Sequence, residues 1–285
     1  MSSDLLPAAG EPLVGSVRLP AGARVSAYGT DELVAWVTVE PVPDAGRIWL
    51  ALSGATAQTG LQPLLWVGPG NDPDYRPGDD FLEPHDVTGL DDTDAAALLA
   101  RGWGGNTLDS DPEEAAAWAA HYGIEHLSWD DDPETARLYA PYGETFPGLA
   151  PATSGRLPAA EITRAVDLMG PAHVCLVQAR RPADVLPLIG WQPTDLFETA
   201  LPVAAILRSW EDRFGARLLR IGPGAELRLV VQRPPRTTEQ ATAIAAEHLA
   251  LSGTWIDPDN GHALTSISDI APRLVNNPQW GFWWD

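Results

Sequence analysis

Arginine is the residue type that suggests chemistry most clearly, because seven arginines gather between residues 208 and 236. The same stretch has only three acidic residues, so its net charge is +4 in a chain of net charge −21. A guanidinium binds carboxylate or phosphate through parallel hydrogen bonds. This stretch is predicted either to pair with the protein's own acidic residues or to bind an anionic ligand or an acidic partner surface. The candidate binding residues are Arg208, Arg213, Arg217 and Arg228.

The closing segment Trp280-Gly281-Phe282-Trp283-Trp284-Asp285 is dense in aromatic residues. In an extended chain, side chains alternate between faces, so Trp280, Phe282 and Trp284 share one face and Trp283 and Asp285 share the other. Large aromatic side chains mostly serve cores, which favours a central buried strand. The alternative is that Trp283 borders a groove filled by a partner, with Asp285 beside it. Trp283 and Asp285 are therefore also candidate binding residues.

Acidic residues dominate the first half of the chain. Residues 1–160 carry a net charge of −18, and 18 acids lie between residues 71 and 135. A run of this kind is usually a solvated surface, although it could also occupy the basic site of a partner such as a nuclease toxin. No calcium loop is predicted, because Arg76 and Pro77 stand where such a loop needs an oxygen ligand and a glycine. The candidate partner surface comprises Asp79, Asp80, Asp91, Asp92, Asp130, Asp131 and Asp132.

Several classes of enzyme are excluded by residue types that the sequence lacks. It has no lysine, which P-loop proteins, pyridoxal-phosphate enzymes and protein kinases require. No Gly-x-Ser-x-Gly motif occurs, and the single cysteine, Cys175, lies in an apolar stretch where a thiol is normally inert. His121 and His126 have poor spacing for zinc. His248 is expected to be a core histidine. No catalytic residue, metal or cofactor is predicted.

Charge and hydropathy also limit the partners and the location. Phosphate backbones bind Lys and Arg, so the net charge of −21 argues against nucleic acid. The first residues lack a signal-peptide pattern, and no apolar run approaches the length of a membrane span. A cytoplasmic protein that binds no membrane is expected. The sequence leaves the oligomeric state open.

The predicted elements alternate without a strict βαβ rhythm, which favours the α+β class. Local signals include Gly215 after one helix, Thr237 or Thr238 before another, and the turn at residues 222–225. If Ile221 pairs with Glu226 across that turn, Arg217 and Arg228 share one face and Arg220 points to the other. Strands are predicted near 13–19, 33–39, 61–67, 173–177, 216–221, 226–231 and 280–285, and helices near 44–58, 92–101, 112–121, 202–214, 237–251 and 266–275.

A stretch rich in Pro and Gly at residues 141–160 is predicted to be a linker. It would separate an acidic α/β domain at 1–140 from a second α/β domain at 161–285. The second domain is expected to contain a mixed sheet flanked by helices and closed by the aromatic C-terminal strand.

The second half resembles a known family in several separate stretches that fall in the right order. These are residues 207–218, Arg233-Pro234-Pro235-Arg236-Thr237, Ala245-Ala246-Glu247-His248 and the closing Trp280–Asp285 segment. Together they resemble the bacterial domain of unknown function 4253 family over about residues 172–285. The resemblance implies an origin among bacteria, where actinobacterial members are common. It implies no activity and no site residues.

Two functional interpretations follow. The leading one is a cytoplasmic, non-enzymatic binding protein of the immunity type, whose acidic surface engages a basic protein partner. The alternative is an enzyme or small-molecule sensor that binds an anionic ligand in a cleft between the halves, lined by Trp283, Arg208, Arg213 and Asp285. A structural module without a ligand is the third possibility.

Overall fold

The protein is represented by a computed structural model. The predicted helix near 112–121 lies outside the described residues, as do His121, His126 and the candidates Asp80, Asp130, Asp131, Asp132 and Asp285. The structure describes residues 5–68, 79, 81–103, 133–192, 199–222, 225–253, 255–256, 263–264 and 266–284.

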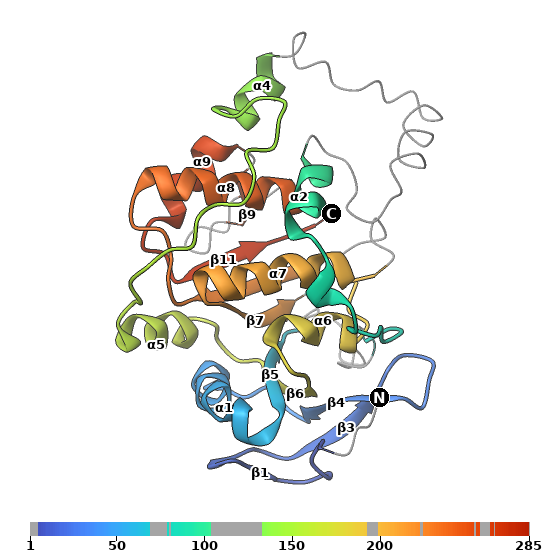
Figure 1. Ribbon diagram of the computed structural model, residues 1–285. Helices are drawn as coiled ribbons and strands as arrows, with labels where there is room; N and C mark the ends of the chain where they lie inside the picture. Colours follow the sequence, from blue (N-terminus) through green and yellow to red (C-terminus); the bar gives the residue numbers. More distant parts are fainter. Residues whose placement is uncertain are drawn as a thin grey trace.

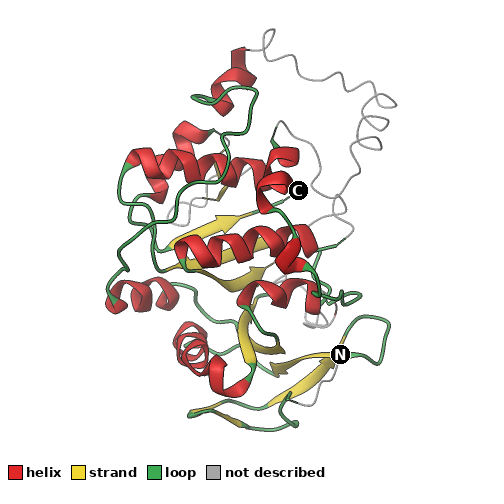
Figure 2. Cartoon of the chain, in the orientation of Figure 1, coloured by secondary structure: helices red, strands yellow, loops and turns green. Residues whose placement is uncertain are grey.

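One mixed sheet runs through the described part of the chain (Figures 1 and 2). Its strand order is β10-β9-β11-β8-β7-β5-β6-β4-β3. Strands β5 and β7 run parallel, whereas the other paired strands run antiparallel. The predicted α+β class is confirmed. The strands are β3 (Gly22–Ser26), β4 (Leu33–Thr38), β5 (Leu61–Trp66), β6 (His173–Gln178), β7 (Ala216–Gly222), β8 (Glu226–Val231), β9 (Trp255–Ile256), β10 (Ala263–Leu264) and β11 (Gln279–Phe282), with β1 (Leu13–Val14) and β2 (Val17–Arg18) in a small second sheet.

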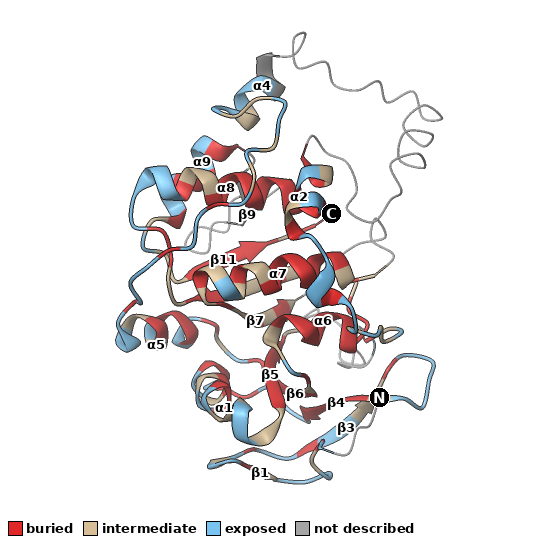
Figure 3. Cartoon of the chain, in the orientation of Figure 1, coloured by how far each residue is buried: buried red, intermediate tan, exposed pale blue. Residues whose placement is uncertain are grey.

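Helices cover both faces of the main sheet. Neighbouring residues of a strand point to opposite faces, and accordingly Leu64 and Cys175 belong to one core cluster while Leu65 and Leu176 belong to the other. The first cluster includes α2 (Ala95–Gly102), α7 (Leu201–Phe214), α8 (Thr238–Ser252) and α9 (Ile267–Leu274), and the second includes α1 (Ala45–Thr59) and α5 (Ala159–Asp167). The central strands and the inner sides of α7 and α8 are buried (Figure 3). The remaining helical segments are η2 (Leu90–Asp92), α4 (Pro133–Tyr139), η3 (Pro182–Asp184) and α6 (Val185–Leu188).

The predicted helix ends follow from local chemistry. The side chain of Thr237 accepts a hydrogen bond from the backbone N–H of Gln240 and starts α8, and Ser266 does the same for Asp269 at α9. Gly215 ends α7 with a φ of +62°, a conformation that glycine adopts without strain. None of the helices in the described ranges has the length and apolar character needed to cross a bilayer.

The aromatic segment forms a buried strand, as predicted. Strand β11 lies between β8 and β9, and Trp280 and Phe282 are completely buried. Phe282 stacks on Trp210 of α7 with ring centroids 5.3 Å apart, and His248 of α8 packs against the same rings. This cluster joins the sheet to the two long helices.

Strands from before and after the proline- and glycine-rich stretch alternate in the main sheet. Strand β6, from residues after the proline- and glycine-rich stretch, lies between β5 and β4, which precede that stretch. Strand β5 also pairs with β7, with Leu65 opposite Arg220. The division into domains at 1–140 and 161–285 stays a prediction. In the main sheet, strands β4 and β5 of the first segment form hydrogen bonds with strands β6 and β7 of the second.

The register of the β7–β8 hairpin differs from the pairing of Ile221 with Glu226 that the sequence suggested. Ile221 pairs with Leu227 and Gly222 pairs with Glu226, and the register shifts between Leu218 and Arg220. Because a bulge adds a residue to one strand, side chains beyond it change face. Ile221 therefore joins the core under α7, whereas Arg220 points toward the α5 side and bonds the carbonyl of Met169.

Candidate functional site: an arginine-lined cleft

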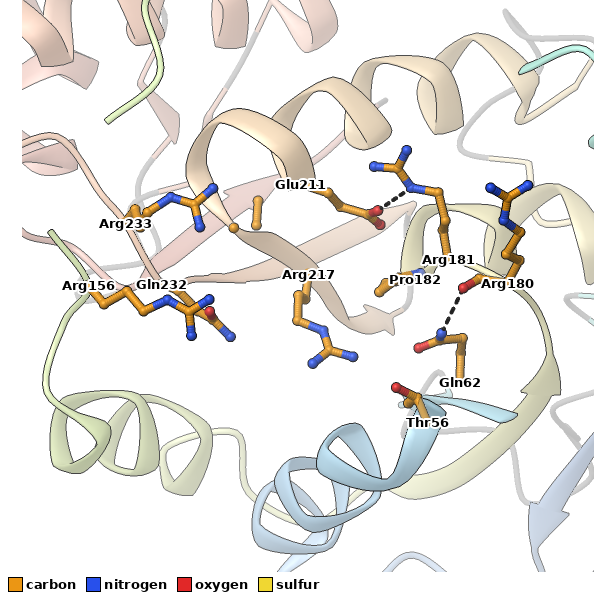
Figure 4. Close-up of a pocket in the computed structure, with 12 residues that line it drawn as sticks. Thr56, Gln62, Arg156, Arg180, Arg181, Pro182, Glu211, Arg217, Gln232 and Arg233 are labelled. Carbon is orange, nitrogen blue, oxygen red and sulfur yellow. Dashed lines mark hydrogen bonds and ion pairs between the residues drawn. The ribbon is translucent and has the colours of Figure 1, made fainter. Parts of the chain in front are cut away.

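An open cleft of about 470 Å³ lies at the end of the sheet where β5 and β7 begin and β6 and β8 end (Figure 4). Helix α1 forms one wall, and the segments that follow β6 and β8 complete it. Side chains from the N-terminal and the C-terminal halves of the chain therefore line the cleft. The lining residues are Thr56, Gln62, Arg156, Arg180, Arg181, Pro182, Glu211, Gly215, Ala216, Arg217, Gln232 and Arg233.

Among the described residues, five arginines and one carboxylate line this cleft. Arg156, Arg217 and Arg233 have no carboxylate partner among the described residues. Arg156 is exposed, and Arg233 donates from Nη2 to the backbone carbonyl of Asp212 at 2.9 Å. The cleft thus has an excess of positive charge in a strongly acidic protein.

Arg217 points into the middle of the cleft (Figure 4). Its Cζ lies 5.9 Å from the ring centroid of Trp49, and its Nη1 donates to the carbonyl of Ser53 at 3.3 Å. Trp49 is itself fixed, because its indole N–H donates to the carbonyl of Pro63 at 3.0 Å. Burial lowers the pKa of the Arg217 guanidinium, and the charge of Glu211 opposes that shift. Arginine stays protonated under such conditions, so the cleft holds a partly desolvated cation.

The turn after α7 sets the position of Arg217. The left-handed conformation of Gly215 carries the chain directly from the helix into β7, two residues before Arg217. A Cβ at Gly215 would lie 3.2 Å from Nη1 of Arg233. The left-handed backbone therefore favours glycine at this position, and a larger residue would also have to displace the Arg233 side chain slightly.

Arg181 is held rigidly by carboxylates of α7. Its Nε donates to Oε2 of Glu211 at 2.8 Å, and its Nη2 donates to Oδ1 of Asp212 at 2.7 Å. The other oxygen of Glu211 accepts from the backbone N–H of Ala183 at 2.6 Å. Burial raises the pKa of Glu211 to about 6 against the opposing effect of Arg181. Both oxygens of Glu211 are occupied, so this carboxylate positions Arg181.

Arg180 reaches outward from the same segment. Its side chain is 84 % exposed, and its Nη1 lies 3.8 Å from Oδ2 of Asp91. An exposed pair at this distance contributes little to stability. Arg180 is thus available to a second partner at the mouth of the cleft.

Gln62 on β5 presents an unsatisfied acceptor to the cleft. Its Nε2 donates to the backbone carbonyl of Arg180 at 3.4 Å, which directs the amide oxygen toward the cavity (Figure 4). That oxygen has no hydrogen-bond partner, although Gln62 is only 5 % exposed. A buried acceptor without a donor costs about 1–3 kcal/mol. On the cleft wall, this acceptor could receive a donor from a bound molecule.

Three of the four candidate arginines lie in ion pairs. Arg208 is buried and donates to Asp184 at 2.7 Å and to Asp91 at 2.8 Å. Arg213 pairs with the fully buried Glu247, and Arg228 pairs with Glu226. Arg217 is the candidate that lines the cleft. Trp283 is half-buried and is not part of the lining, and Asp285 lies outside the described residues.

The candidate acidic surface is described at Asp79, Asp91 and Asp92. All three are exposed, and Asp91 bridges Arg208 and Arg180. Part of its charge is therefore already neutralised by the protein's own guanidinium groups. The other candidates of that surface are outside the described ranges.

Other reactive side chains lie in the core. Cys175 is buried, and burial raises the pKa of its thiol, so it does not act as a nucleophile. His248 is completely buried, and burial holds its pKa well below the usual value, which keeps the ring neutral. Neither ring nitrogen of His248 has a hydrogen-bond partner in the structure. Among the described residues there is no group of three His, Cys, Asp or Glu side chains placed to hold a metal.

Sequence reasoning missed Arg156, Arg180, Arg181 and Gln62. The pair Arg180-Arg181 follows directly after the apolar run 173–177, and charged residues just past a buried strand often lie at a sheet edge. That signal could have identified two of the arginines. Arg156 and Gln62 are single residues in segments far apart in the sequence, and no local pattern connects them.

The comparisons with known proteins concern the C-terminal part of the chain. Residues 173–285 match the model of a family described as Domain of unknown function (DUF4253), which confirms the resemblance found in the sequence. The match includes Arg180, Arg181, Glu211, Arg217, Gln232 and Arg233, whereas Thr56, Gln62 and Arg156 lie outside it. No curated protein and no solved structure matched the chain.

Proposed function

We propose that this protein binds a small anionic ligand in the arginine-lined cleft. The observation that carries the proposal is the set of three cleft arginines, Arg156, Arg217 and Arg233, that have no carboxylate partner in the described part of the chain. Arg217 and Arg233 bond only the backbone carbonyls of Ser53 and Asp212, so no described carboxylate neutralises either charge. Cations left without a counter-ion around a cavity are suited to bind an anion.

The environment of Arg217 strengthens this proposal. Its guanidinium is partly desolvated and is held between Trp49 and the carbonyl of Ser53. A fixed donor loses little conformational entropy when a ligand binds. Reduced contact with water also strengthens its attraction for an anion.

The net negative charge of the protein opposes anion binding. Its effect in the cleft is weaker than that of the arginines that line it. A net charge of −21 repels anions at long range. At physiological salt the Debye length is about 8 Å, so distant carboxylates are largely screened, whereas direct contacts with guanidinium groups are not. Anion binding in the cleft is therefore governed by the lining arginines.

Binding is favoured over catalysis. Glu211, the carboxylate in the described lining, has both oxygens engaged by Arg181 and Ala183. Cys175 and His248 are buried in the core and do not line the cleft. A ligand-sensing or carrier role, in the cytoplasm as the sequence analysis expects, fits this arrangement.

Calorimetry with inorganic phosphate and with sulfate at constant ionic strength tests the proposal. The wild-type protein is expected to bind both, and Arg217→Gln is expected to weaken binding by about tenfold to a hundredfold, since a hydrogen bond to a charged group contributes about 1.5–3 kcal/mol. Arg137→Gln on α4 makes the same charge change at an exposed position away from the cleft and serves as the control. Equal losses in the two variants, or no binding by the wild type, would contradict the proposal.

The acidic partner surface remains a prediction. Its support is the net charge of −18 in residues 1–160. The engagement of Asp91 by Arg208 and Arg180 reduces the part of that surface that a basic protein could use. The cleft is therefore preferred as the functional site.

A further inference from the structure

The lining of the cleft limits the kind of anion that fits. Its uncharged side chains are mainly polar or small, as in Thr56, Gln62, Gln232 and Pro182, and none of the described lining residues is aromatic. Nucleobases and aromatic acids usually bind against aromatic or broad apolar surfaces. The described part of the lining has no such surface, so a compact and highly polar ligand fits it better.

The number and placement of the cations favour phosphate over a single carboxylate. Arg156 and Arg233 lie to one side of Arg217, and Arg180 and Arg181 lie to the other (Figure 4). A phosphate monoester carries about −1.5 to −2 charges at pH 7 and offers three acceptor oxygens. Its extra oxygen and higher charge let it accept from more guanidinium groups than the two oxygens of a single carboxylate.

The amide oxygen of Gln62 adds a requirement of its own. It is buried, it accepts no hydrogen bond, and it faces the same cavity as Arg217. A fully ionised carboxylate or sulfate has no proton to donate to it, and an ammonium group would be repelled by the five arginines of the described lining. A hydroxyl group is the donor that suits both the acceptor and the positive surroundings.

Building on the proposed function, we propose that the cleft binds the phosphate monoester of a sugar or a similar polyhydroxyl compound. The phosphate lies against Arg217 and the neighbouring arginines, and a hydroxyl of the same molecule donates to the amide oxygen of Gln62. Thr56 and Gln232 supply further neutral hydrogen-bonding groups for the remaining hydroxyls.

A panel of calorimetric titrations tests this assignment. The probes are glycerol 3-phosphate, glucose 6-phosphate and inositol 1-phosphate, compared with inorganic phosphate, glucose, AMP and citrate. At least one polyol phosphate is expected to bind about tenfold more tightly than inorganic phosphate, because it satisfies the buried acceptor as well as the arginines. Glucose alone is expected not to bind. If no polyol phosphate exceeds inorganic phosphate, or if AMP or citrate binds more tightly than all of them, the assignment is wrong.

Gln62→Leu separates this inference from the proposed function. The substitution removes the acceptor but keeps a side chain of similar size, so the ratio of polyol-phosphate affinity to inorganic-phosphate affinity is expected to fall from about ten to about one. An unchanged ratio of the two affinities in Gln62→Leu would overturn the role of the hydroxyl and leave anion binding intact. Arg217→Gln is expected to weaken both ligands equally, and a protein that binds no anion at all fails both proposals.

Discussion

Arg213 and Glu247 form a two-pronged ion pair, in which Nη1 lies 2.6 Å from Oε1 and Nη2 lies 2.6 Å from Oε2. Glu247 is fully buried in α8 and also accepts from the indole N–H of Trp210 and the backbone N–H of Ala150. The pair thereby joins α7, α8 and the proline- and glycine-rich stretch, which contains Ala150. Each carboxylate oxygen of Glu247 accepts two hydrogen bonds. A buried carboxylate is tolerated when its charge is paired and its oxygens are hydrogen-bonded in this way.

Replacing Glu247 by Gln is expected to lower the free energy of unfolding by about 3–5 kcal/mol, because it leaves the Arg213 charge buried without a counter-charge. Urea unfolding followed by tryptophan fluorescence measures the change. Glu239→Gln, at an exposed position in the first turn of the same helix, is the control and is expected to change stability by less than about 1 kcal/mol. A Glu247→Gln protein as stable as the control would show that the pair is dispensable.

The raised pKa of Glu211 predicts that anion binding depends on pH. Above about pH 6 this carboxylate is charged and offsets part of the positive charge of the cleft; below about pH 6 it is protonated and the cleft becomes more positive. Sulfate, whose own charge is constant in this range, is therefore expected to bind about fivefold more tightly at pH 5.5 than at pH 7.5. Arg181, Arg217, Asp212 and Asp184 are the other charged groups around Glu211.

Glu211→Gln provides the matched control for that dependence. Its sulfate affinity is expected to be high at both pH values, because the titrating group is gone while the amide can still accept from Arg181. A wild-type affinity that stays constant between pH 5.5 and pH 7.5 would contradict the assignment of Glu211 as the titrating group.

The aromatic strand is expected to be essential for stability. Phe282→Ala removes a completely buried ring that stacks on Trp210, and a loss of about 3–5 kcal/mol is expected. Deleting residues 280–285 removes the centre of the β8–β11–β9 pairing and is expected to abolish the cooperative thermal transition. Trp283→Ala, at a half-buried position in the same segment, is expected to cost clearly less. A truncated protein that melts at the wild-type temperature would refute the structural role of β11.

Separate expression of residues 161–285 tests the predicted division into domains. In the full chain β6 is hydrogen-bonded on both sides by β4 and β5, and its residues Val174 and Cys175 are completely buried. The fragment lacks both neighbouring strands, so it is expected to show no cooperative unfolding on its own. Mixing it with residues 1–160 should restore a transition. A fragment that unfolds cooperatively alone would support two independent domains.

Elements with strong local signals could be predicted from the sequence. Helices α7, α8 and α9 follow from apolar periodicity together with Gly215, Thr237 and Ser266, and β11 follows from its aromatic composition. Helix α5 was missed because it begins after Pro158 without a capping side chain, inside the stretch predicted to be a linker. Short strands such as β3 and β9 depend on the neighbours that they pair with, which a local pattern does not reveal.

The cleft itself could not be predicted. It exists because β5 pairs in parallel with β7, which brings Gln62 and Thr56 close to side chains about 150 residues later in the chain. The arginine-rich stretch was recognised, but local charge does not distinguish Arg213, which has a buried carboxylate partner, from Arg217, which has none within the described ranges. That distinction depends on which acidic residues the fold places nearby.

The use of arginine alone for the cations of the cleft has a practical consequence. Guanidinium groups keep their charge across the whole range of physiological pH, and the sequence has no lysine. Acetyl transfer to side-chain amines, which silences many basic surfaces, has no target here, and amine-reactive dyes or crosslinkers will leave the cleft unmodified. Vicinal dicarbonyl reagents that react with guanidinium groups, such as phenylglyoxal, are the chemical probes suited to this protein.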